Sequence, residues 1–262
     1  MLFKSDTNYF KFLLPVALCT AVACHTTPPA AEKKPSSILT MQAPGVHYTS
    51  YQGDIGARRR ITLPDSSVVI LNSSSLLLVP DNYGQEKRQV LLDGDAWFTV
   101  NPAPAVFTVI ADKLTAEVLG TQFRMRCFTN QQGATVHLLT GKLKVSKSYH
   151  SETDNQPEIL ERGNMILANK EIDLMEKETY NPQDAESWLA DSLQLTNAQG
   201  LLMWRTLEDW YGVEISVKGD ASKTTPVTKL FVKATLQQVL DALGKEQGFS
   251  YKTEGSKVEI KF

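Results

Sequence analysis

The feature that most constrains this chain is a series of short apolar or alternating segments between Arg60 and Ser146, each bounded by turn residues. Such runs, rich in Val, Ile, Thr and Phe and separated by Pro-Asp-Ser, Asp-Gly and Thr-Gly, are typical of strands and hairpins. We therefore expect residues 47–175 to form a mainly β domain, either a β-sandwich or a β-helix-like fold. The segments are RITLPDSSVVILNSSSLLLVP, RQVLLDGDAWFTV, FTVIADKLTAEVLGTQFRMRCF and ATVHLLTGKLKVS.

Local features within these segments predict details of the β domain. Asp93-Gly94 supplies the left-handed backbone of a tight turn. Trp97 and Phe98 should then point to opposite sides of the strand that follows, so that one aromatic ring enters the core. Gly120 interrupts a strand pattern, which indicates a bulge or a close approach of another segment.

Three aspartates in this region could suggest catalysis, but turn chemistry explains them better. Asp65, Asp93 and Asp95 lie in turn-like contexts, where an aspartate side chain accepts a hydrogen bond from its own backbone. Cys127 lies among strand-type residues and is expected to be a buried structural thiol rather than a nucleophile.

Taken in this order, the β segments resemble the periplasmic domain of the FecR family, the membrane regulators of iron-uptake sigma factors. The resemblance includes the further segment LERGNMILAN and runs through most of residues 47–175. Two positions depart from the family pattern: Ser66 replaces a common glycine, and Asp95 replaces a common glutamate. Both are expected to alter a turn or the surface without changing the fold.

A second pattern begins after residue 176 and predicts a small α/β domain over residues 176–262. Apolar residues in the segment QGLLMWRTLEDWYG recur at helical spacing and stop at Gly212, and the strand VEISVKG follows. The unit repeats as the strand TKLFVKA, a helix from Thr235 to Gly248 and a terminal hairpin that turns at Glu254-Gly255. Repeated strand-helix-strand units predict helices packed on one face of a small sheet. The residues expected in the helical core pattern are Leu201, Leu202, Trp204, Leu207 and Trp210, with Tyr211 beside them.

This tail looks like the C-terminal domain that follows FecR domains in Bacteroidetes proteins, which is similar to the secretin and TonB short N-terminal fold. That fold is a protein-interaction module, so the resemblance implies a protein partner rather than a substrate. The clustered aromatics Trp204, Trp210 and Tyr211 could instead form a ligand platform, but their helical spacing favours core packing.

The N-terminal segment predicts export. An apolar run of roughly a dozen residues follows Lys4 and Lys11, which is too short to span about 30 Å of hydrocarbon and fits a signal peptide over residues 1–24. Small residues precede Cys24 in a pattern that resembles a lipobox, so Cys24 is the predicted lipidation site. The alternative is an ordinary cleaved signal in which Cys24 is incidental. Residues 25–46 are expected to be a flexible tether, since this stretch begins with prolines and small polar residues.

Composition excludes several function classes. The formal net charge is −2 and the pI is near 6.1, so no whole-molecule field attracts nucleic acid, and the run ARRR at residues 57–60 fits a solvated strand edge better than a nucleic-acid patch. The third cysteine, Cys127, leaves no intramolecular disulfide in the folded part, and no cofactor motif is visible. The histidines lack metal-ligand spacing: His25, His47, His137 and His150.

The resemblances imply a function for the whole chain. In the usual family architecture a cytoplasmic segment binds a sigma factor and the periplasmic part senses a TonB-dependent outer-membrane transporter. Only about ten residues precede the apolar run here, so we expect the sensing half without a sigma-binding domain. The leading hypothesis is a non-enzymatic periplasmic protein of cell-surface signalling, held in the envelope by a lipid anchor. Its expected partner is the signalling domain of a TonB-dependent transporter or a FecR-type regulator.

The alternative is an envelope lipoprotein that binds a glycan or small ligand for nutrient capture. A hydrolytic enzyme is disfavoured, because no nucleophile triad, paired carboxylates or phosphate loop is visible.

Overall fold

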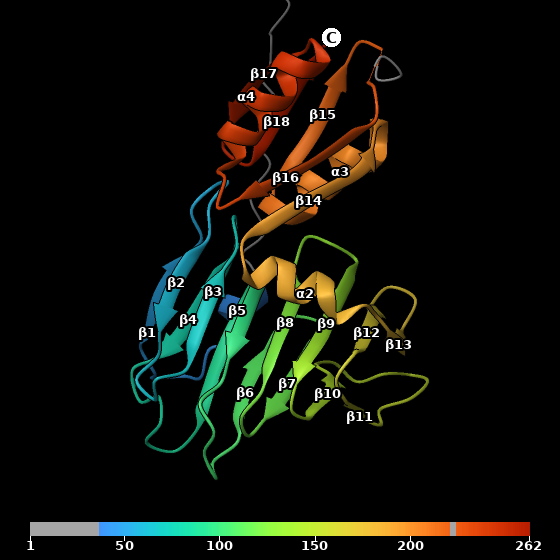
Figure 1. The fold of residues 1–262 in the computed structure, drawn as a ribbon. Coiled ribbons are helices and arrows are strands. Elements are labelled where there is room, and N and C mark those ends of the chain that lie inside the picture. Colours follow the sequence, from blue (N-terminus) through green and yellow to red (C-terminus); the bar gives the residue numbers. More distant parts are fainter. Residues whose placement is uncertain (1–36, 221–223) are drawn as a thin grey trace, which may run out of the picture. The chain divides into compact units, whose positions relative to one another are not determined.

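The computed structural model describes residues 37–220 and 224–262, which belong to one compact unit. The predicted signal peptide, Cys24 and most of the predicted tether lie outside the described residues. A mainly β part comes first and a small α/β part follows, as the sequence predicts (Figure 1). The β part contains α1 (Ser37–Thr40), β1 (Tyr48–Gln52), β2 (Arg59–Thr62), β3 (Val68–Leu71), β4 (Leu76–Pro80), β5 (Arg88–Thr99), β6 (Phe107–Ile110), β7 (Leu114–Val118), β8 (Gln122–Cys127), β9 (Gly133–Thr140), β10 (Leu143–Lys147), β11 (Glu158–Leu160), β12 (Asn164–Asn169) and β13 (Leu174–Thr179).

The thirteen strands of the β part form one continuous hydrogen-bonded network with β5 at its centre. The first half of β5 pairs with β4 and β6, and its second half pairs with β3 and β8. Two halves of the network therefore share this one strand. One half has the order β1-β4-β5-β6-β7-β10-β11, and the other has the order β2-β3-β5-β8-β9-β12-β13.

Both halves contribute side chains to a single hydrophobic core. Val90 and Val109 enter it from one half, and Phe98, Phe123 and Val136 enter it from the other. All strand pairs of this part are antiparallel except β5 with β6. Two sheet faces enclose one core here, and their strands pair mostly in antiparallel fashion. This arrangement defines a β-sandwich rather than a β-helix, which stacks parallel strands.

The predicted tight turn at Asp93-Gly94 is wrong. β5 runs without a break from Arg88 to Thr99, and Gly94 marks the point where the strand passes from one half to the other. Gly94 has φ +143°, and a Cβ atom there would lie 2.3 Å from the Cβ of Ser75. Glycine is required for close approach and an unusual backbone angle, not for a hairpin.

The other local predictions in this region are confirmed. Trp97 and Phe98 point to opposite sides of β5, and both are fully buried. Phe98 stacks on Phe123 in the sandwich core, whereas Trp97 lies in a separate cluster with Trp188. Gly120 permits close approach, because a Cβ atom there would lie 2.8 Å from the Cγ of Pro102.

The C-terminal part consists of α2 (Pro182–Leu189), β14 (Ser192–Ala198), α3 (Gly200–Tyr211), β15 (Glu214–Lys218), β16 (Val227–Val232), α4 (Leu236–Gln247), β17 (Ser250–Glu254) and β18 (Lys257–Lys261). The expectation of one small sheet is wrong, since the strands form two sheets, β14-β16 and β15-β18-β17. Each strand-helix-strand unit crosses from one sheet to the other. Helices α3 and α4 and both sheets share one core cluster.

Helix ends in this part follow the predicted signals. α3 ends at Gly212, with φ +60°, and α4 ends at Gly248, with φ +77°, both in the left-handed conformation. Thr235 caps α4 in a capping box with Gln238. The predicted core positions Leu201 and Leu202 are an exception. They lie in the first turn of α3 and are 63% and 65% exposed, because the buried stripe begins only at Met203.

Candidate interaction surfaces

β16 is an edge strand of the two-stranded sheet β14-β16, and apolar side chains are exposed along it. Within the described residues β16 pairs only with β14, in antiparallel register. Alternation along the strand turns Leu230 and Val232 to solvent, each 56% exposed, while Val227 is buried in the core. The strand's one charged residue, Lys229, forms an ion pair with Glu246 of α4. The edge therefore offers unpaired backbone groups beside an apolar surface.

The other edge strands expose no comparable apolar surface. β11 is only three residues long, and β1 and β14 expose polar side chains. Short strands and charged side chains are the usual protection of sheet edges. Among edge strands in residues 37–220 and 224–262, β16 alone exposes two large apolar side chains. The exposed charged residues on the protected edges are Arg59 and Arg60 on β2, Glu176, Lys177 and Glu178 on β13, Glu214 and Lys218 on β15, and Lys252 and Glu254 on β17.

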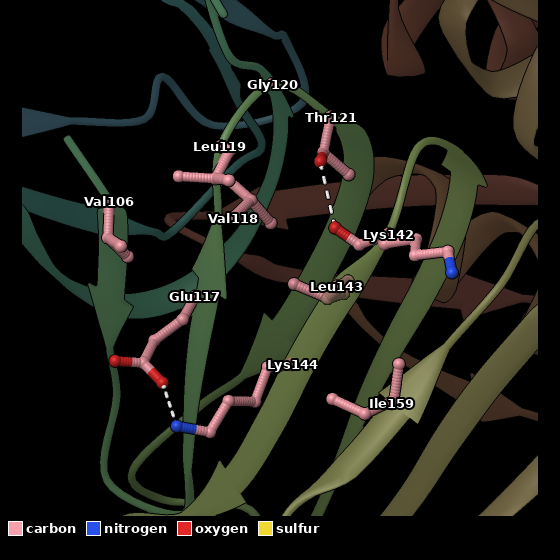
Figure 2. A pocket seen from close by; sticks show the side chains of 10 residues that line it. All are labelled: Val106, Glu117, Val118, Leu119, Gly120, Thr121, Lys142, Leu143, Lys144 and Ile159. Atoms are coloured by element: carbon pink, nitrogen blue, oxygen red, sulfur yellow. Dashed lines mark hydrogen bonds and ion pairs between the residues drawn. The ribbon is translucent and has the colours of Figure 1, made fainter. Parts of the chain in front are cut away.

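An apolar groove lies in the β part, where β7 and β10 separate. Their ladder ends at the cross-strand pair of Lys144 and Glu117, whose charged groups are 2.7 Å apart, and the groove opens beyond it (Figure 2). The cavity is about 450 Å³, and its exposed walls are Val106, Leu119 and Ile159. Its charged side chains pair with one another or with a neighbour, so no charge pattern selects an occupant.

A largely buried arginine connects the β part with the C-terminal part. Arg58 precedes β2, and its guanidinium carbon lies 3.8 Å from the ring centre of Trp188 on α2 and 4.5 Å from that of Trp210 on α3. Its Nη1 donates to the carbonyl of Trp188 and lies 3.1 Å from a carboxylate oxygen of Asp191. We call Arg58, Trp188, Trp210 and Asp191 the Arg58 clamp.

The charge inside the Arg58 clamp is costly to bury. Burial lowers the pKa of Arg58 to about 10, while the charge of Asp191 opposes that shift. The second terminal nitrogen of Arg58, Nη2, is buried without a hydrogen-bond partner. Two aromatic faces and one carboxylate compensate the charge in part.

A second polar network lies next to the clamp. Asp95 on β5 is fully buried and receives two hydrogen bonds from Arg124 on β8, at 2.8 and 2.6 Å, and one from Asn72, at 2.8 Å. Burial alone would raise the pKa of Asp95, but the charge and hydrogen bonds of Arg124 hold it below its ordinary value. Asp209 of α3 lies 3.3 Å from Arg126 of β8 and extends the network to the C-terminal part.

The structure corrects two expectations about these residues. Asp95 is neither a turn residue nor a surface residue, because it lies within β5 under the Arg124 side chain. The run at residues 57–60 is not uniformly solvated: Arg59 and Arg60 are exposed on edge strand β2, as predicted, but the Arg58 side chain is only 12% exposed, within the clamp. Sequence reasoning missed the clamp, although Asn181 and Pro182 signal the start of α2, the helix that carries Trp188.

The remaining candidates have structural roles. Asp65 accepts a hydrogen bond from the backbone N–H of Ser67, as a turn aspartate should, whereas Asp93 accepts from the more distant backbone of Thr129. Ser66, at a glycine position of the family pattern, adopts φ +68° in the same turn as Asp65. Cys127 is a free, buried thiol, as predicted. Cys24, the predicted lipidation site, lies outside the described residues.

Two properties of residues 37–220 and 224–262 bear on the type of site. No group of three or more His, Cys, Asp or Glu side chains could hold a metal ion there. Among the helices of residues 37–220 and 224–262, none has the length and apolar character needed to cross a membrane.

Comparison with known proteins identifies the family. No curated protein matches the chain significantly in sequence. Two crystal structures of a "putative anti-sigma factor" from Parabacteroides distasonis ATCC 8503 are similar in fold, each with 23% sequence identity. One has a TM-score of 0.59 and covers 81% of this chain and 98% of its own, and the other has a TM-score of 0.58 and covers 82% and 99%. Residues 50–144 match the FecR protein model and residues 203–260 match the FecR C-terminal model. These two matches together span more than half of the chain, which belongs to the FecR family.

Proposed function

We propose that this chain is a non-enzymatic, periplasmic FecR-family protein that binds a protein partner by adding the partner's strand to the edge of β16. The observation that carries the proposal is the open β16 edge with Leu230 and Val232 exposed beside it. Strand addition obtains affinity from backbone hydrogen bonds and specificity from alternate side chains. The β16 edge has two exposed apolar side chains and a single charge, Lys229, that is paired with Glu246, so it can supply both.

The partner we propose is the signalling domain of a TonB-dependent transporter or a FecR-type regulator. Membership of a regulatory family supports a protein partner rather than a substrate. The proposal includes attachment to the envelope through a lipid on Cys24, which follows from the lipobox-like residues before that cysteine. The groove of Figure 2 has no part in the proposal, because its charges are paired internally.

The test is crosslinking of the tagged full chain in its native envelope, followed by mass spectrometry of the captured proteins. Three chains are compared: the parent, a Leu230→Lys/Val232→Lys variant, and an Ile172→Lys control that changes an apolar residue 68% exposed at a site away from β16. Lysines on an edge disfavour strand pairing, so the double variant should lose the partner while the control keeps it.

The identity of the captured protein decides the proposal. A TonB-dependent transporter or a membrane-spanning FecR-type regulator that is lost with the β16 variant supports it. Capture of such a partner by the β16 variant at the parent level excludes the edge as the docking site. Recovery of glycan-handling proteins alone, or of nothing, contradicts the signalling role.

A further inference from the structure

The C-terminal end of β16 is tied directly to the Arg58 clamp. Ser192 of β14 pairs with Val232 of β16 as the last register pair, and the backbone N–H of Lys233 then donates to the carbonyl of Asp191 at 2.7 Å. Asp191 is the clamp residue whose carboxylate faces Arg58. Asp191 therefore accepts the hydrogen bond at the end of the β14–β16 ladder and also forms the ion pair with Arg58.

The backbone at this junction is unusual. Asp191 has φ +52° and Lys233 has φ +51°, the left-handed region that non-glycine residues seldom adopt. A non-glycine residue is strained in this region unless its surroundings impose the conformation. A second contact fixes the same end of the strand: the hydroxyl of Tyr211 on α3 donates to the carbonyl of Ala234 at 2.8 Å.

The clamp continues from Arg58 into the β-sandwich. The ring of Trp188 stacks on that of fully buried Trp97 of β5, with ring centres 6.2 Å apart and planes at 25°. The guanidinium carbon of Arg124 lies 4.9 Å from the Trp188 ring centre, and Arg124 holds Asp95 of the same strand β5. Contacts therefore run without a gap from Lys233 through Asp191, Arg58 and Trp188 to Trp97.

We propose that Arg58 is a relay residue that couples strand addition at β16 to the β5–β8 region of the sandwich. The proposal rests on the docking mode of the proposed function. A strand added to β16 restricts motion at the C-terminal end of β16. Through its ion pair, Asp191 then restricts the Arg58 guanidinium, which contacts Trp188 and Trp210. Arg58 suits this role because its single carboxylate partner, Asp191, lies on the segment that enters β14. The position of the Arg58 guanidinium therefore depends on the position of that segment.

The test uses a tethered strand in place of the natural partner. Cys19 and Cys24 of the full chain are replaced by serine, and Thr228→Cys places a thiol on the exposed face of β16, while Cys127 stays buried. A short peptide of alternating threonine and valine is attached there by a disulfide, which gives an effective concentration of about millimolar. Hydrogen exchange of backbone amides in β16, β5 and β8 is then compared with and without the peptide.

Two variants isolate the relay. Arg58→Gln removes the charged fork, and Arg59→Gln is the matched control, since Arg59 is exposed on β2. The peptide should slow exchange in β16 in every chain, and slow it in β5 and β8 by about fivefold, the lower end of typical coupling, only in the parent and the Arg59→Gln chain. If Arg58→Gln does not fold, Asp191→Asn cuts the same link, because asparagine tolerates the left-handed backbone.

The outcomes separate the relay from the docking mode. In one outcome, the peptide protects β16 in the Arg58→Gln chain and slows exchange in β5 and β8 as much as in the parent. That result overturns the relay and leaves strand addition intact. Protection of β16 with no response in β5 or β8 in the parent also overturns it. A peptide that leaves β16 unprotected contradicts strand addition itself, and the relay fails with it.

Discussion

Arg124 on β8 holds the buried carboxylate of Asp95 on β5 through two hydrogen bonds, from Nε to Oδ1 at 2.8 Å and from Nη2 to Oδ2 at 2.6 Å. Asp95 is fully buried and the Arg124 side chain is only 13% exposed, so water screens this pair little. The pair joins neighbouring strands of the sandwich at the place where α3 also makes contact.

Asp95→Asn should lower the free energy of unfolding by about 3 kcal/mol, because the largely buried Arg124 guanidinium then keeps only the more exposed carboxylate of Asp209, 3.7 Å away, as a counter-ion. Urea unfolding followed by circular dichroism measures the change. Lys177→Gln is the control: it removes the surface pair with Glu158, whose side chains are 43% and 39% exposed, and should cost at most about 1 kcal/mol. Equal losses in the two variants would contradict a special role for the buried pair.

Stability should fall between pH 6.5 and about pH 4 because of His137. Burial, with a contribution from the charge of Arg124, lowers the pKa of His137 to about 4. Below pH 6.5 the unfolded chain binds a proton at this histidine that the folded chain does not bind, so the loss grows as pH falls and is complete near pH 4. The total is about 3 kcal/mol, at 1.36 kcal/mol for each pKa unit.

Unfolding by urea at several pH values checks this expectation. His137→Gln should remove the decrease in the free energy of unfolding between pH 6.5 and 4. His150→Gln, at an exposed position, should keep that decrease. Asp95 acts in a lower range, since its folded pKa lies below the ordinary value and its contribution disappears only as pH falls further. If the free energy of unfolding of His137→Gln depends on pH as in the parent, other groups cause the decrease.

Gly94→Ala should destabilise the sandwich by about 3 kcal/mol or more, because the new Cβ would lie 2.3 Å from the Cβ of Ser75 and φ is +143°. Gly255→Ala provides a control with positive φ and open space around the Cβ position, and should cost roughly 1 kcal/mol. The difference in urea midpoint between the two variants measures the steric part. Similar midpoints would mean that β5 can shift away from β4 without penalty.

Cys127 should be unreactive in the folded protein. Burial raises the pKa of its thiol, which keeps it in the weakly nucleophilic protonated form, and the side chain is 0% exposed. In a chain with Cys19→Ser and Cys24→Ser, a thiol reagent at pH 8 should modify Cys127 only after urea unfolds the sandwich. Rapid modification without urea would show that this part of β8 opens readily.

Local signals in the sequence were sufficient for many elements. Thr235 and Gly248 fix the two ends of α4 by chemistry within a few residues, and the alternating segments of the β part fold into strands as expected. These features depend on neighbours along the chain. The FecR resemblance was confirmed for the same reason, since its motifs are local and recur in order.

Features that depend on distant residues could not be predicted. Asp93-Gly94 has the composition of a turn, but pairing of β5 with four other strands keeps it extended. Arg58, Arg59 and Arg60 are identical in type, and only the position of Trp188, 130 residues further along the chain, separates the buried one from its neighbours. The lipidation of Cys24 and the domain boundaries stay predictions.

The shared strand β5 limits how this molecule can be divided. Because the same twelve residues pair with β4 and β6 at one end and with β3 and β8 at the other, neither half of the sandwich has a complete set of strands without the other. A fragment that stops before residue 88 or starts after residue 99 lacks the strand that both halves need. Proteolysis or truncation within this part should therefore yield an unfolded chain instead of a smaller folded one, and chemical unfolding of the sandwich should occur in one cooperative step.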